Sequence, residues 1–391
     1  MNLEREVYHE EKLAVIVELE AGRLKVIDAS ADSGYGVRLG QDGKLGFGFA
    51  KTEKKAENLA GKAMVRKFDG FPGQPERKGQ EVCHDIAEAM NPEVLAKRVQ
   101  EMAGVLGAPT SVAAFASVVK RHIWNSNGLD LTEKQSWVGY QAYTARDGSE
   151  GWESWEGRQD EKEAWMKTAR TAEDWCRKWQ GAVPEGGEIK NLPMVLSARA
   201  ISSLMGVLLL PNLSGSRALH GQTLLRVGEP VENAGLKLIH KPDLHQSAFD
   251  GEGMVPRKFT VFDGGLKTYL HTWDTAREMG GSAEPTATAA RSWQTYPDVY
   301  PQDLEVKAPK SELSDSDSFV FVNDLSGVHT VDPLSGRFMV EAHQAFVMPD
   351  WQPVQPFMLS GTLGQLLAGR TFMKPEARGN FWLPALEITP Q

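Results

Sequence analysis

The chain has 391 residues, of which 41% are hydrophobic and 24% are charged, and this composition is typical of a soluble globular protein with two or three domains. Its net charge of −9, without a lysine- or arginine-rich block, argues against a nucleic-acid partner, because contacts to phosphates need a basic surface. The two cysteines, Cys83 and Cys176, lie far apart and no CxxC or Cys/His spacing occurs, so neither a disulfide framework nor a structural zinc site is indicated.

The N-terminal region is predicted to form an antiparallel β-meander. Its first six residues are polar and contain no signal-peptide core, so we expect a cytoplasmic protein without a membrane partner. Apolar runs rich in valine and isoleucine alternate with turn residues over the first fifty positions, and Asp42-Gly43 is a strong hairpin signal. The expected strands are Leu13–Leu19, Arg23–Ala29, Gly36–Leu39 and Lys44–Ala50.

Three helices are expected in the same half of the chain. The first follows Thr52, and the second begins at Asn91-Pro92, where a capping residue precedes proline at the first helical position. Strands are expected over 111–147, with a turn at Asn125–Gly128. The third helix is expected over roughly 160–180.

A break at Val183–Gly187 marks the predicted domain boundary. We therefore expect an N-terminal α/β domain over residues 1–186 and a C-terminal domain over residues 187–391. In the second domain, one strand (Leu192–Leu196) and one helix (Ser197–Leu208) precede short apolar runs separated by glycine-containing turns. This pattern favours a mainly antiparallel β domain, barrel- or sandwich-like, and the predicted fold class is α+β.

Common catalytic and metal-binding motifs are absent from the sequence. Gly46-Phe47-Gly48 lacks the third glycine of a dinucleotide-binding loop, and neither a GxxxxGKS/T loop nor a G-x-S-x-G elbow occurs. His9-Glu10 has no second histidine one helical turn later, and Pro242 separates His240 from His245. The sequence therefore predicts no metal site in this chain.

A tryptophan-rich stretch leaves two interpretations open. Trp152 and Trp155 lie between glycines and glutamates, where they either form a stacking platform or pack in a core. Trp165, Trp175 and Trp179 have the spacing of one helix face, which favours burial.

Carboxylates in the C-terminal half are also ambiguous. Asp250, Glu252, Asp263 and Asp274 can support acid–base chemistry only where the fold brings two of them within reach of a substrate. Phe249–Gly253 is first of all typical of a turn, in which Asp and Gly satisfy the backbone.

Several segments, taken in order, resemble the TldD/PmbA family. Phe249–Arg257 is similar to the family's D-x-E-G-x-P turn. The other matching segments are Gly34–Leu39, Gly46–Thr52, Asn125–Gly128, Phe262–Leu266, Tyr269–Leu270, Asp274–Ala276, Asn323–Gly327, Val331–Phe338 and Leu359–Leu367. Their order and spacing extend over nearly the whole chain. The resemblance implies an α/β domain followed by a mostly antiparallel β domain, with subunits that pair into a dimer.

One helix decides which kind of subunit the chain resembles. TldD-like members carry His-Glu-x-x-x-His on the helix after the first strand of the C-terminal half, and a later cysteine as a further zinc ligand. The matching segment here is Ser197–Val207, and no His, Cys, Asp or Glu occurs between Lys190 and His220. The chain is therefore similar to the TldE/PmbA type, and Ala198, Ile201, Leu204, Met205 and Leu208 form an apolar stripe that is expected to pack.

The resemblance implies a non-catalytic subunit of a heterodimeric zinc metallopeptidase that acts on unfolded or flexible peptides, in proteolysis or peptide maturation. Zinc is then expected in a TldD-like partner and not in this chain. The candidate peptide-channel residues are Ser214, Gly215, Ser216, Asp250, Glu252, Gly253 and His329. Two alternatives stay open: a homodimeric peptide-binding or scaffold protein, and an enzyme that uses the carboxylates of Asp250, Glu252 and Asp263.

Overall fold

The computed structural model describes residues 3–76, 83–107, 110–183, 189–242, 247–301 and 303–389, and the chain divides into two compact units. Unit 1 comprises Met1–Gln180 together with two later segments, Gln246–Val255 and Ala290–Pro297. Unit 2 comprises the remaining residues. The predicted boundary after residue 186 falls in 184–188, outside the described residues.

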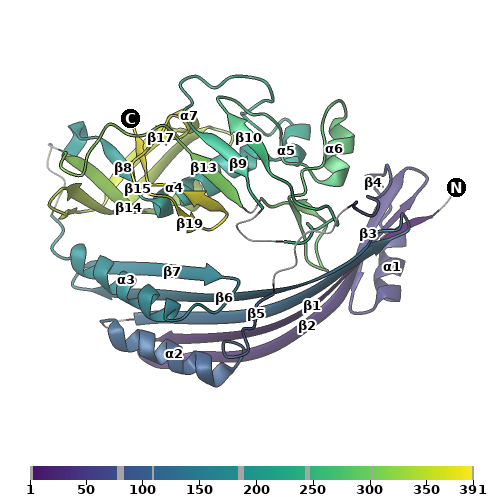
Figure 1. Ribbon diagram of the computed structural model, residues 1–391, viewed down its shortest axis with the longest axis horizontal. Coiled ribbons are helices and arrows are strands. Elements are labelled where there is room, and N and C mark those ends of the chain that lie inside the picture. Colours follow the sequence, from purple (N-terminus) through teal and green to yellow (C-terminus); the bar gives the residue numbers. More distant parts are fainter. Residues whose placement is uncertain are drawn as a thin grey trace. The chain divides into compact units, whose positions relative to one another are not determined.

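Unit 1 is built on a seven-stranded antiparallel sheet with the order β4-β3-β2-β1-β5-β6-β7 (Figure 1). Its strands are β1 (Glu4–Glu20), β2 (Arg23–Gln41), β3 (Lys44–Ala50), β4 (Arg66–Lys67), β5 (Thr110–Asn125), β6 (Asp130–Arg146) and β7 (Ser149–Gly157). The predicted meander is confirmed, including the hairpin at Asp42-Gly43, where both residues have positive φ. The prediction of separate strands at 23–29 and 36–39 is wrong, because β2 runs through the polar stretch between them while paired to β1.

Three helices pack on one face of this sheet: α1 (Glu53–Lys62), α2 (Pro92–Val105) and α3 (Ala164–Lys178). The α2 start is confirmed, since the Asn91 side chain accepts a hydrogen bond from the Glu93 N–H at 2.9 Å and proline takes the first helical position. Strand alternation sends Val17, Ala114 and Tyr140 into the core beneath α2 and α3. The residues next to these in each strand point to the opposite face of the sheet. That face carries none of the three helices and is called the helix-free face below.

The two later segments of unit 1 lie on the helix-free face at one end of the strands. Phe249 and Trp293 pack there with Tyr8, Ile123 and Leu131 in a small buried cluster. Two stretches that lie far beyond β7 in the sequence therefore complete the core of the N-terminal unit.

Unit 2 contains a five-stranded sheet (β10-β9-β13-β20-β19), a seven-stranded sheet (β16-β15-β14-β8-β21-β18, with β17 paired to β15) and a two-stranded ribbon (β11-β12). Its strands are β8 (Met194–Leu196), β9 (Lys237–His240), β10 (Phe259–Asp263), β11 (Ala289–Ala290), β12 (Asp298–Val299), β13 (Leu304–Lys307), β14 (Phe319–Ser326), β15 (Arg337–Met348), β16 (Gln352–Val354), β17 (Phe357–Thr362), β18 (Arg370–Thr371), β19 (Glu376–Arg378), β20 (Phe381–Leu383) and β21 (Leu386–Ile388). Most pairings are antiparallel, with parallel exceptions at β8–β14 and β13–β20. The α+β class with a β-rich C-terminal half is confirmed. Both larger sheets are open, so the sheet does not close into the barrel that was one of the two predicted forms.

Short helices connect the strands of unit 2. They are α4 (Ala198–Leu204), α5 (Gly215–Leu219), α6 (Trp273–Met279) and α7 (Leu363–Leu367). α4 passes into a π-helical turn over Met205–Leu209 and a 3-10 turn over Leu210–Leu213, so the predicted helix from Ser197 to Leu208 is confirmed in place but not as one regular α-helix. Within the described ranges, no helix has the length and apolar character needed to cross a membrane.

Candidate functional site

Helix α4 occupies the position at which the sequence resemblance places a zinc motif. Ser197 caps it, accepting a hydrogen bond from the Ala200 N–H at 3.1 Å, and the predicted apolar stripe is buried in the unit 2 core, as expected. The polar side chains Ser202 and Ser203 donate to backbone carbonyls, those of Arg378 and Arg199.

Zinc in a protein needs three or four imidazole, thiolate or carboxylate ligands. α4 offers none of these groups, so its donor set does not fit zinc. Among the residues that the structure describes, no group of three or more His, Cys, Asp or Glu side chains is placed to hold a metal ion.

The predicted residues Ser214, Gly215 and Ser216 lie at the start of α5, against His271. Ser214 caps α5 and the Gly215 N–H donates to the Leu270 carbonyl at 2.8 Å. A Cβ on Gly215 would stand 2.2 Å from Nδ1 of His271, so only glycine fits there. The imidazole is buried, and burial lowers the pKa of His271 to about 4. Sequence reasoning missed His271, because nothing local links it to a glycine more than fifty residues earlier.

The predicted residues Asp250, Glu252 and Gly253 belong to unit 1 and form the expected turn. The Asp250 carboxylate accepts hydrogen bonds from the N–H groups of Glu252 and Met254, each at 2.9 Å. Gly253 has φ +82°, and a Cβ there would meet Leu129 at 2.6 Å. The Asp250 side chain therefore stabilises the backbone of its own turn.

Glu252 enters a buried ion cluster with Glu6, Arg38 and Arg291. Arg38 donates to both carboxylate oxygens of Glu6 at 2.8 Å and to Oε1 of Glu252 at 2.9 Å. Arg291 Nη1 lies 2.8 Å from Glu6 Oε1, and all four side chains are at most 1% exposed. Burial alone would raise the pKa of Glu6, but the two arginines together hold it below its usual value.

The carboxylates considered for acid–base chemistry do not all lie in one place. Glu252 is ion-paired in unit 1, whereas Asp263 is an exposed residue of unit 2 that pairs with Lys237 Nζ at 2.9 Å. His329, the remaining candidate, is exposed on a short 3-10 turn (Val328–Thr330) of unit 2. The predicted residues thus divide between the two units.

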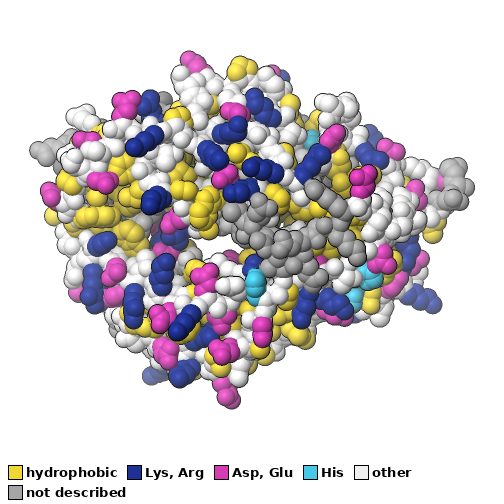
Figure 2. All heavy atoms as spheres, in the orientation of Figure 1, with side chains coloured by type: hydrophobic (Ala, Val, Ile, Leu, Met, Phe, Trp, Pro, Cys, Tyr) yellow, Lys and Arg dark blue, Asp and Glu magenta, His cyan; other side chains and the backbone are white. Residues whose placement is uncertain are grey.

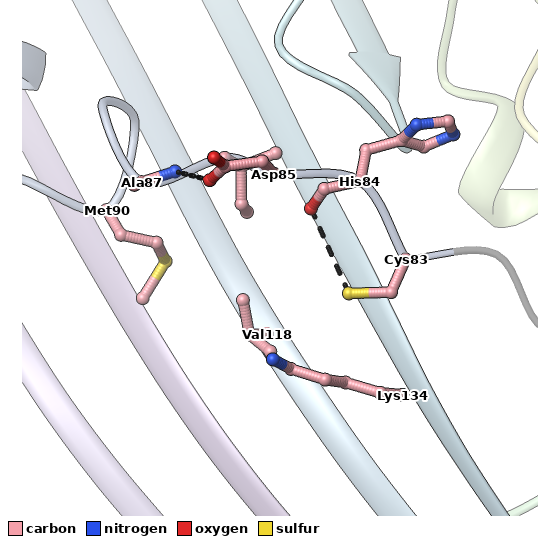
Figure 3. A pocket seen from close by; sticks show the side chains of 8 residues that line it. Cys83, His84, Asp85, Ala87, Met90, Val118 and Lys134 are labelled. Carbon is pink, nitrogen blue, oxygen red and sulfur yellow. Dashed lines mark hydrogen bonds between the residues drawn. The ribbon is translucent and has the colours of Figure 1, made fainter.

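A shallow depression of about 360 Å³ in unit 1 is lined by Cys83, His84, Asp85, Met90 and Lys134, among others (Figure 3). The Cys83 thiol points toward the His84 carbonyl at 3.9 Å, while the His84 ring points away from it. Among the residues labelled in Figure 3, no imidazole or carboxylate faces the thiol, so the described lining does not support nucleophilic catalysis.

The part of the tryptophan-rich stretch that contains Trp152 and Trp155 forms β7. Alternate residues of this strand point to the helices and to the helix-free face. Trp155 points to the helix side and packs on Tyr140, with ring centroids 5.9 Å apart. Trp152 points to the helix-free face, where it is 36% exposed and opposite Tyr143 of β6. Trp155 therefore packs in the core, whereas the stacking-platform interpretation of Trp152 stays a prediction.

The outer edge of the same sheet is exposed over the first half of β2. Residues 23–33 pair with β1 on one side, and β3 pairs with β2 only from Tyr35 onward. Large apolar side chains stand exposed along this edge and the adjoining β1: Leu13 (54%), Ile16 (38%), Leu24 (36%) and Ile27 (55%). Such an edge offers a row of main-chain donors and acceptors to another strand.

Comparison with known families gives matches to both parts of the chain. Residues 189–389 match the model of the PmbA/TldA metallopeptidase C-terminal domain, and residues 6–65 match that of the PmbA/TldA metallopeptidase domain 1. The first of these matches alone extends over more than half of the chain.

Individual relatives share the fold over nearly the full length. An uncharacterized protein of Methanocaldococcus jannaschii is 25% identical over 385 residues, covering 93% of this chain and 89% of that protein. The structure is similar to that of a candidate modulator of a DNA gyrase from Thermotoga maritima (TM-score 0.84, 19% identity, 99% and 95% of the two chains). It is also similar to TldE from Thermococcus kodakarensis (TM-score 0.80, 18% identity, 99% and 96% of the two chains).

Proposed function

The chain belongs to the PmbA/TldA metallopeptidase family, and from this we propose that it is the metal-free, TldE-like subunit of a two-chain cytoplasmic zinc peptidase. In this proposal a TldD-like partner supplies zinc and catalysis. The present chain completes the dimer and helps to bind unfolded or flexible peptides, in proteolysis or peptide maturation.

The observation that carries this proposal is the chemistry of α4. A peptidase zinc site needs ligands for the ion and a carboxylate to take a proton from the bound water. The residues of α4 and its π-helical extension are apolar, small or serine, apart from Arg199, whose positive charge would repel a cation. Because α4 lacks metal ligands in a chain of a metallopeptidase family, we infer that the chain has a role other than metal binding.

The exposed edge of β2 supports a partner-binding role. An edge strand of this length and apolar character is a liability in a lone chain, because it pairs readily with strands of other chains. A homologous subunit with its own β2 is a suitable occupant. On the face shown in Figure 2, lysine and arginine side chains are interspersed with aspartate and glutamate, which is unlike a nucleic-acid interface.

The second candidate function is a homodimeric peptide-binding or scaffold protein, and the same β2 edge favours it, since a second copy offers an equivalent strand. The carboxylate-enzyme alternative gains no support, because Glu252 is held in an ion cluster and Asp250 caps a turn. The seven candidate channel residues remain part of the proposal, with Ser214–Ser216 and His329 in unit 2 and Asp250–Gly253 in unit 1.

The test is capture of the tagged full chain from its native cell at low salt, followed by sequencing, zinc analysis and a peptidase assay of the eluate. We expect co-elution of a His-Glu-x-x-x-His protein with about one zinc per complex, and activity that a chelator removes. Recovery of a partnerless, inactive self-dimer would favour the second candidate, and a monomer would contradict both.

A further inference from the structure

The outer edge of β2 presents a regular row of main-chain groups. Every residue from Ile27 to Ser33 is exposed, and among the described residues no strand pairs with this stretch on the side away from β1. The carbonyl of Arg5, an odd-numbered residue of β1, accepts from the Ser126 N–H just after β5, so even-numbered residues of β1 bond to their even-numbered partners in β2. The Ser33 carbonyl instead accepts from Lys51 Nζ at 3.0 Å, just after β3. Odd-numbered residues from Ile27 onward therefore direct both main-chain groups outward.

The side chains of this edge are complementary to a second copy of themselves. Ile27 is 55% exposed, and Leu13, which lies opposite Ala31 in the β1–β2 register, is 54% exposed. Both point to the side of the sheet that carries the helices, since Ile27 lies opposite the buried core residue Val17. Only the small side chain of Ala31 separates Leu13 from the open edge. Ala29 lies midway between the bulky residue and the small one.

We propose that a second copy of this chain pairs antiparallel along the β2 edge, about a two-fold axis at Ala29. In this register Ile27 of each copy lies opposite Ala31 of the other, two strand spacings or about 10 Å from Leu13, and the two large side chains meet over the alanine. Outward-pointing residues then face outward-pointing residues, as hydrogen-bonded pairs require. The pairing covers the exposed apolar side chains of both copies and goes beyond the proposed function, because it concerns this chain alone.

The order of charges along the edge agrees with the antiparallel orientation. Arg23 and Lys25 precede Ile27, whereas Asp28 and Asp32 follow it, so the basic end of each copy lies beside the acidic end of the other. Asp32 already pairs with Lys51, which makes this attraction a minor contribution.

One charge opposes the pairing and gives it a signature. Asp28 of each copy lies opposite Ser30 of the other, which sets the two Asp28 side chains on a diagonal, about 7–8 Å apart. Like charges at that separation repel. We therefore expect the self-association to tighten with salt, and with Asp28→Asn by about two- to fivefold.

A cysteine at the axis tests the register. Cys83, which is partly exposed, is first replaced by serine. Cα atoms of a hydrogen-bonded antiparallel pair lie about 5.5 Å apart, within the range that a disulfide spans. Ala29→Cys should therefore give a disulfide-linked dimer of the full chain under mild oxidation, seen by non-reducing electrophoresis. The matched control Ala31→Cys should not, because the two copies of residue 31 are four residues apart along the strands, about 13 Å.

Light scattering over a range of protein concentrations measures the association itself. Ala29→Pro should abolish it, because proline has no N–H to donate across the edge. The same change should leave the monomer folded, since the Ala29 N–H points away from β1. The control Ala29→Val keeps the N–H and should keep the association. Melting curves check that each variant is folded.

A chain that stays monomeric at every concentration, equal cross-linking at positions 29 and 31, or association unaffected by Ala29→Pro would overturn the proposal. Cross-linking of position 29 to a TldD-like partner, with the chain alone monomeric, would assign the edge to that partner and not to a second copy. The zinc-bearing partner of the proposed function is tested separately by the zinc content of the captured complex, so either idea can fail while the other stands.

Discussion

Replacing Glu252 by alanine removes one of two carboxylates that balance Arg38 and Arg291 in the buried cluster. Arg38 would keep its two contacts to Glu6 but lose the one to Glu252 at 2.9 Å. The cluster would carry one uncompensated positive charge at a site where the side chains are at most 1% exposed. Breaking a buried pair in this way costs about 3–5 kcal/mol.

Glu252→Gln should cost less, about 1.5–3 kcal/mol, because the amide oxygen still accepts a hydrogen bond from Arg38. The control is Glu284→Gln, which breaks an ion pair of similar length, 2.7 Å to Arg257, whose two side chains are 54% and 70% exposed. That exposed pair should contribute less than about 1 kcal/mol.

The assay is urea unfolding combined with hydrogen exchange, read on peptides from 34–41 and 247–255. We expect Glu252→Ala to lower the free energy of unfolding of unit 1 and to open both peptides together. Because the pKa of Glu6 is lowered in the fold, the contribution of the cluster is present above the ordinary pKa of 4.5 and is lost as the pH falls below it. A loss below about 1 kcal/mol for Glu252→Ala, or exchange confined to 247–255, would refute the reasoning.

Three further predictions concern unit 2 and the sheet edge. Burial lowers the pKa of His271 from 6.5 to about 4, so the unfolded state binds a proton before the folded state does as the pH falls. The free energy of unfolding should therefore drop by up to about 3 kcal/mol between pH 6.5 and 4. His271→Gln should flatten this part of the curve of stability against pH, measured by urea titration. Gly215→Ala should destabilise the protein by about 1–3 kcal/mol through the 2.2 Å approach to His271, and adding His271→Ala should recover part of the loss in thermal melts. Ile27→Lys should change the stability of the isolated chain by less than about 0.5 kcal/mol, because the side chain is exposed, yet it should reduce subunit association in light scattering. The control Met339→Lys, at a 65% exposed position of unit 2, should leave association unchanged. Equal effects of the two variants would argue against the β2 edge as the site of association.

Local signals in the sequence predict local structure well in this chain. Asp42-Gly43 has the positive φ angles that its hairpin requires, and Asn91-Pro92 combines a side-chain cap with a proline that needs no N–H partner. The apolar stripe of α4 is likewise evident from spacing alone. In each case the determining contacts lie within a few residues along the chain.

Long-range pairing could not be predicted in this way. Arg38 and Glu252 are 214 residues apart, and no sequence pattern around either residue indicates that they pair. Trp293 joins Tyr8 only because the chain returns to unit 1 after leaving it. Trp152 and Trp155, an odd number of positions apart, must face opposite ways in a strand, but the glycines and glutamates around them gave no sign of β7.

The resemblance of the sequence to a family carried the functional interpretation further than any local signal. The residues of α4 contain no zinc ligand, and this absence follows from the sequence alone. The neighbours of the candidate residues required the structure, since His271 beside Gly215 and Arg38 beside Glu252 come from distant segments.

The most direct test of the central claim is the zinc content and peptide hydrolysis of this chain alone and of its reconstituted complex with a TldD-like partner, measured in the same preparations. The proposal predicts no bound zinc and no hydrolysis for the isolated chain. It predicts zinc-dependent hydrolysis for the complex, abolished by replacing the glutamate of the partner's His-Glu-x-x-x-His motif. Stoichiometric zinc in the isolated chain, or hydrolysis that survives that replacement, would contradict it.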